Sequence, residues 1–143
     1  MAEHVDPAGA LVARLKNDTQ LATLSSSRIA TERDDDWPMP AFAVLVEGPR
    51  GGPGELELGI VEERFDFKCY GPNEREARRF SDLVLQRLIP RGATRTPSGF
   101  VLAHTRVYSV RSEGGRIILH EPNVDWPYGL CALLVKYSGV RVP

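Results

Sequence analysis

The chain has 143 residues, 26% of them charged, and a formal net charge of −1, which suits one ordinary globular domain. This nearly balanced charge argues against a protein that mainly neutralises phosphates over a large basic surface. No apolar run approaches the roughly 20 residues of a bilayer span, and residues 1–10 lack a basic segment followed by an apolar one. We therefore expect a single domain over residues 1–143, with neither membrane insertion nor a secretory leader.

The two cysteines, Cys69 and Cys131, each lie within an apolar run of strand character. Neither has a second cysteine or a histidine at the spacing of metal ligands. We expect both to be buried thiols in a chain made in a reducing cytoplasm, with oxidation between them as the minor alternative.

The first part of the chain predicts two short helices followed by two strands. Asp6 can cap a helix and a proline follows it, which favours a helix over about residues 7–17. Residues 19–24 suit a short second helical turn, and residues 28–31 a short edge strand. Residues 41–47 are nearly all apolar β-formers, which predicts a buried strand.

A glycine- and proline-rich connection follows that strand. Residues 48–54 contain four glycines and two prolines, which indicates a flexible loop between two strands. Beyond it, apolar residues fall on even numbers over residues 56–60 and on odd numbers over residues 65–69. Because strand side chains alternate between faces, we expect a bulge, a bend or a change of partner strand near residues 61–63. The pattern predicts a long, bent β-hairpin that protrudes with the loop at its tip.

The second half of the chain predicts one long helix and three strands. An Asn cap, two early glutamates and an apolar stripe place the helix at residues 74–89. Strands are expected at residues 100–110, 116–120 and 128–137, the first two joined through residues 113–115. This order predicts an α+β fold, with helices on one face of a mainly antiparallel sheet.

The sequence contains no convincing catalytic, cofactor or metal site. The only tempting cluster is His104, His120, Glu121 and Asp125, but its spacing matches no ligand motif and solvent-facing strand positions explain it equally well. No serine lies in a nucleophile elbow, and the glycine-rich loop lacks the Lys and Ser/Thr of a phosphate-binding loop. We expect no enzymatic activity and no cofactor.

Two further features allow both a structural and a binding interpretation. The arginines of the helix at residues 74–89 could hold phosphate, but interleaved acidic residues favour a solvated face or a polar interface. Trp37 and Trp126 each precede a proline, which suits lids over the core better than interface anchors.

The middle of the chain resembles the tail terminator proteins of long-tailed bacteriophages, especially phages of actinobacteria. The resemblance is carried by Pro40–Val44, by the run Arg64–Gly71 and by Glu76-Ala77-Arg78. The shared order is a leading helix, a proline-flanked strand, a Gly/Pro loop, a strand ending in an aromatic residue and glycine, a helix beginning with Glu-Ala, and closing strands. It implies a structural virion protein whose ring, typically hexameric, caps the tail tube and joins it to the head-side connector. No catalytic residue is carried over.

The predicted hairpin suits such an assembly, because an arm with exposed strand edges can add to the sheet of a neighbouring subunit. The candidate subunit-interface residues are Pro49, Arg50, Pro53, Leu56, Leu58 and Ile60. The partners implied are further copies of the chain, the tail tube protein and a head-side connector or stopper protein, with DNA only passing through the ring lumen. The expected location is the head–tail joint of the virion, without membrane contact.

Three alternatives stay open at this point. The first is a neighbouring neck component, such as a stopper or head-completion protein, which would bind portal-side complexes rather than tail tubes. The second is an unrelated small binding module, which persistent monomers would favour. The third is a small enzyme, which stoichiometric bound metal would favour.

Overall fold

The computed structural model describes residues 5–52, 54–57, 59–90, 99–122 and 124–139. The helices are α1 (Pro7–Lys16), α2 (Thr19–Ser25) and α3 (Glu74–Leu88). The strands are β1 (Ile29–Ala30), β2 (Ala43–Glu47), β3 (Gly54–Glu57), β4 (Ile60–Tyr70), β5 (Phe100–Leu102), β6 (Thr105–Ser112), β7 (Ile117–His120) and β8 (Pro127–Gly139).

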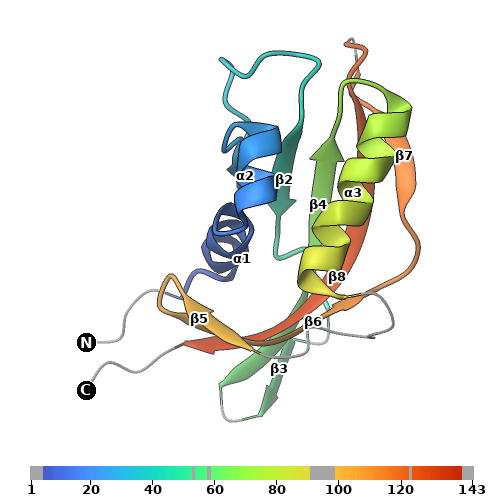
Figure 1. Cartoon of the computed structure of the whole chain (residues 1–143). Helices are drawn as coiled ribbons and strands as arrows, with labels where there is room; N and C mark the ends of the chain where they lie inside the picture. The colour runs from blue at the N-terminus through green and yellow to red at the C-terminus, as the bar shows by residue number, and fades with distance from the viewer. Residues whose placement is uncertain (1–4, 53, 58, 91–98, 123, 140–143) are drawn as a thin grey trace.

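All of these strands belong to one sheet in the order β1-β2-β4-β8-β6-β5, with β3 added to β4 and β7 added to β8. Every pairing is antiparallel except the parallel pair of β1 and β2. The helices lie on one face of this curled sheet, and no helix in the described part of the chain covers the other face (Figure 1). The predicted α+β class and the mainly antiparallel sheet are confirmed.

Helices α1 and α3 each begin directly after a residue whose side chain caps the helix. The Asp6 carboxylate accepts a hydrogen bond from the Gly9 amide at 2.9 Å, and the Asn73 side chain accepts one from the Glu76 amide at 2.9 Å. The apolar stripe of α3 is buried as predicted, including Phe80 and Val84. These caps and stripes fix the helices on the sheet.

The core lies between the helices and the long central strands β4 and β8. These strands pair over ten consecutive residues, from Val61 opposite Tyr137 to Tyr70 opposite Tyr128. Phe65, Phe67 and Cys69 of β4 point toward the helices and are fully buried. Cys69 and Cys131 are both buried free thiols, as predicted, and their mutual contact together with burial raises the pKa of Cys69.

Of the bulge, bend or change of partner expected near residues 61–63, the change of partner is confirmed, because this edge of β4 pairs with β3 up to Glu62 and with β2 from Asp66 onward. Strand β4 keeps an unbroken register with β8 through these residues. The change in alternation arises earlier, because the chain reverses between β3 and β4 and the register of β3 against β4 shifts between Glu55 and Glu57. Thus Leu56 belongs to β3, whereas Ile60 and the odd-numbered apolar residues from Phe65 to Cys69 belong to β4.

The prediction of one strand over residues 100–110 is also wrong. A tight turn divides it into β5 and β6, with positive φ angles of 48° at Ala103 and 56° at His104. Neither turn residue is the Gly or Asn that normally announces such a hairpin. The link at residues 113–115 also makes no hairpin, because β6 and β7 both pair with β8, one beyond the other.

Candidate subunit interface

The glycine- and proline-rich loop lies along β4 rather than standing free. The Arg50 amide donates to the Arg64 carbonyl at 2.7 Å, and the Arg64 amide donates to the Gly51 carbonyl at 2.5 Å. These two hydrogen bonds continue the sheet past the end of β2. Residues 50 and 51 of the predicted tip are therefore hydrogen-bonded along β4.

Two glycines allow this close approach. Gly48 has a φ of 149°, and a Cβ there would lie 2.7 Å from Cδ1 of Phe65. Gly52 has a φ of 129°, and a Cβ there would lie 2.9 Å from the Cα of Glu63. Both positions need glycine, because backbone angle and space exclude a side chain.

The part of this region that projects from the molecule is the hairpin of β3 and β4 (Figure 1). Of the predicted interface residues, Pro49 and Arg50 are exposed on the loop and Ile60 is half-buried at the start of β4. Pro53, Leu58 and the side chain of Leu56 lie outside the described residues. The projecting arm is thus the hairpin of β3 and β4, and not the loop that precedes it.

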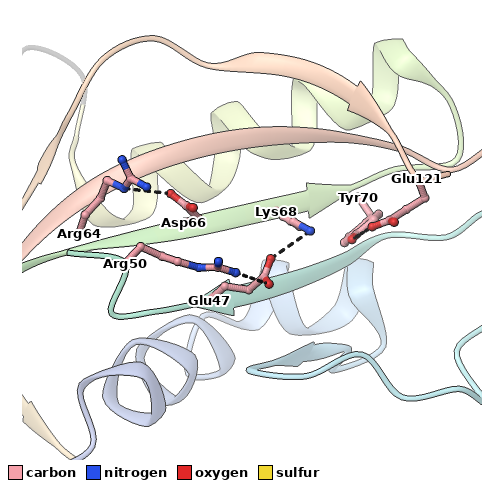
Figure 2. A network of polar contacts seen from close by, with 7 residues as sticks. All are labelled: Glu47, Arg50, Arg64, Asp66, Lys68, Tyr70 and Glu121. Atoms are coloured by element: carbon pink, nitrogen blue, oxygen red, sulfur yellow. Dashed lines mark hydrogen bonds and ion pairs between the residues drawn. The ribbon is translucent and has the colours of Figure 1, made fainter.

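The face of the sheet without helices carries a network of charged side chains, shown in Figure 2. Glu47 at the end of β2 bridges two cations, with Arg50 at 2.9 Å and Lys68 of β4 at 3.1 Å. Beside it, Arg64 contacts Asp66 at 3.5 Å. Because charges of both signs alternate across this face, it can meet a polar partner but presents no single-sign field.

A buried carboxylate extends this network toward β6. Glu62 is only 7% exposed and meets Arg111 of β6 at 3.1 Å. The Arg111 side chain is half exposed, so the pair opens to solvent on one side. Sequence analysis missed this residue pair, because only the register through β8 brings β4 and β6 onto one face.

The other end of the same face is closed by aromatic side chains. Tyr70 and Trp126 stack with ring centroids 4.2 Å apart, and the Trp126 indole donates to the Ala41 carbonyl at 2.9 Å. The Tyr70 hydroxyl donates to Glu121, as Figure 2 shows. Burial first, and then this hydrogen bond, raise the pKa of Tyr70 far above its ordinary value. Trp126 is fully buried, so its predicted role as a lid over the core is confirmed.

The histidines do not converge. His104 precedes β6, whose first residue pairs with Gly139, whereas His120 pairs with Pro127 at the opposite end of β8. His120 contacts Glu74 of α3 at 2.7 Å and Asp125 at 3.3 Å, and the contact with Glu74 raises the pKa of this exposed imidazole. This arrangement ties the end of β7 to the start of α3.

The helices enclose a small hollow beside an ion pair. This hollow has a volume of about 200 Å³, and the ion pair joins Asp18 and Arg87, whose atoms approach to 2.6 Å. Among the described residues, no group of three or more His, Cys, Asp or Glu side chains could hold a metal ion. Within the same ranges, no helix is both long and apolar enough to cross a membrane.

Comparison with known proteins identifies a structural relative but no sequence family. No family model matches the sequence, and no curated protein matches it. A chain in the solved structure of the virion of a native gene transfer agent (GTA) particle is similar, with a TM-score of 0.69 and 13% sequence identity. The match covers 93% of this chain and 95% of that chain. This protein therefore shares the fold of a virion component over nearly its whole length.

Proposed function

We propose that the chain is a structural protein of a phage-like virion and forms a hexameric ring that caps the tail tube and joins it to the head-side connector. The observation that carries this proposal is the fold shared with a virion chain over 93% of the sequence. The order of elements that resembles tail terminator proteins supports the same role independently. In this role the protein is not an enzyme, needs no cofactor, and meets DNA only as it passes through the ring lumen.

The surface described above supports assembly. A projecting hairpin, a helix-free sheet face with paired charges, and strands that end the sheet without a neighbour are the features through which sheets of different subunits join. A contact between different patches of identical subunits, repeated around an axis, closes into a ring. The interface residues proposed within the described chain are Pro49, Arg50 and Ile60.

The partner distinguishes a tail terminator from the neighbouring stopper. The purified protein is mixed separately with uncapped tail tubes and with portal-bearing heads, and each mixture is sedimented. We expect the protein to sediment with the tubes, in an amount set by the number of tube ends rather than by tube length. Sedimentation with heads alone would identify a stopper, and sedimentation with neither would contradict a role at the head–tail joint.

A further inference from the structure

Strand β7 is an edge that has no partner on one side. It pairs with residues 127–130 of β8, and no other described strand pairs with it. In an antiparallel ladder alternate residues direct their amide and carbonyl groups to opposite sides. Half of the backbone groups of β7 therefore point outward from the sheet and can accept another strand.

Two exposed side chains of β7 are apolar, which favours pairing with another strand. Ile117 is 54% exposed and Leu119 is 37% exposed, and they lie opposite Leu130 and Tyr128 on the helix-free face. Edge strands of soluble proteins usually carry a lysine, a proline or a bulge that prevents pairing. β7 has none of these between Ile117 and His120.

Strand β3 is a second free edge, at the opposite corner of the sheet. It pairs only with β4 among the described strands, with Glu55 opposite Val61. Ile118 of β7 lies opposite Gly129, which lies opposite Cys69 of β4. Residues 61 and 69 are separated by roughly 26 Å along β4, at about 3.3 Å per residue. One molecule cannot pair its own β3 with its own β7.

We propose that β7 of one copy receives β3 of the next copy, so that neighbouring sheets join edge to edge around the ring. This inference rests on the proposed ring and names the surface that forms it. The two strands have the same length, four residues each. Since the paired edges lie at opposite corners, the contact is heterologous and each copy uses both edges once.

Charge also matches the two edges. Arg116, just before β7, forms an ion pair with Asp82 of α3, and His120, at the end of β7, contacts Glu74 of the same helix. On that side the exposed Arg75 and Arg78 have no ion pair among the described residues. The incoming β3 carries the exposed carboxylate of Glu55. A strand laid beside β7 brings this carboxylate toward unpaired arginines.

Two sets of variants test the contact. Ile117→Lys with Leu119→Lys places charge on the exposed face of β7, and Val101→Lys does the same on strand β5, where Val101 is 47% exposed. We expect the double variant to raise the concentration needed for ring formation by roughly tenfold or more, because an apolar contact becomes charged. Val101→Lys is expected to assemble as the native chain does. All three side chains are exposed, so thermal unfolding should change little.

Cross-linking then identifies the partner strand. The double variant Glu55→Cys with Ile118→Cys is assembled and treated with a short bismaleimide, because Ile118, like Arg116 and His120, lies on the face of the sheet that α3 covers. The native thiols are buried and give no background. We expect a ladder of linked subunits from the double variant and none from either single variant. Normal ring formation by the Ile117→Lys, Leu119→Lys variant, together with no ladder from the cysteine double variant, would overturn the docking surface alone. A native chain that never forms rings would overturn the proposed ring as well.

Discussion

Among the buried residues of α3, Phe80 has the largest side chain. Its ring is 1% exposed and lies 5.1 Å from the ring of Phe42, centroid to centroid. The neighbouring Arg79 is exposed, and within the described ranges its only ion pair is with Glu76 of the same helix, at 3.6 Å. Two adjacent positions on one helix thus differ almost completely in burial.

This contrast predicts opposite effects of truncation. Phe80→Ala should lower the free energy of unfolding by about 3–5 kcal/mol, because it removes a buried ring and leaves a cavity. Arg79→Ala, as the matched control, should change it by less than about 0.5 kcal/mol. Urea unfolding followed by circular dichroism measures both. Equal effects of the two substitutions would contradict the placement of α3.

His120 makes stability depend on pH. Its contact with Glu74 raises its pKa in the folded chain above the ordinary value of 6.5, so protonation favours the folded state. The stabilisation is complete below the unfolded pKa and is lost as the pH rises through the folded pKa. We expect His120→Gln to reduce stability most near about pH 5.5, with the difference from the native chain shrinking toward about pH 8.5. A difference that is constant over this range would refute the role of the imidazolium.

At the scale of elements, the path from β2 to β3 depends on glycines that lie against β4. Gly52→Ala is expected to destabilise the fold by about 1–3 kcal/mol, because it combines a positive φ with a Cβ 2.9 Å from the Glu63 Cα. Gly115→Ala serves as control, since no described atom lies within 4 Å of a Cβ there. Thermal unfolding of the two variants checks this prediction. Identical melting temperatures would mean that the loop does not lie on β4.

The elements that sequence could predict are those whose signals are local. Helices α1 and α3 carry their own caps and apolar stripes, so residues near Asp6 and Asn73 define where they begin. The turn between β5 and β6 carries no glycine or asparagine, so nothing local divides that strand. The reversal between β3 and β4 resembled a bend, because alternation alone does not tell two short strands from one long strand.

The candidate interface was predictable only in part, for the same reason. The glycines and prolines of residues 48–54 predicted a connection between two strands, but they gave no sign that residues 50 and 51 hydrogen-bond along β4. Which element then projects depends on the pairing of β2 and β3 with different parts of β4. The pair of Glu62 and Arg111 depends on register through a third strand, β8, and has no local signal.

In the whole molecule, the two faces of the sheet differ in what they carry. One face is covered by helices and forms the core, while the other carries the charged network around Glu47 and Lys68. The free edges β3 and β7 lie at opposite corners of this sheet. Such a subunit can contact two neighbours at once through different surfaces, which is the requirement for a closed ring.

Electron microscopy of tail tubes incubated with the purified protein tests the central claim most directly. Uncapped tubes are imaged with and without the protein, and their ends are averaged separately. We expect closed, rotationally symmetric ring density on one end of each tube. This density should be absent from tubes imaged alone and from tubes incubated with the Ile117→Lys, Leu119→Lys variant. Bare tube ends at concentrations at which the protein remains folded would contradict it.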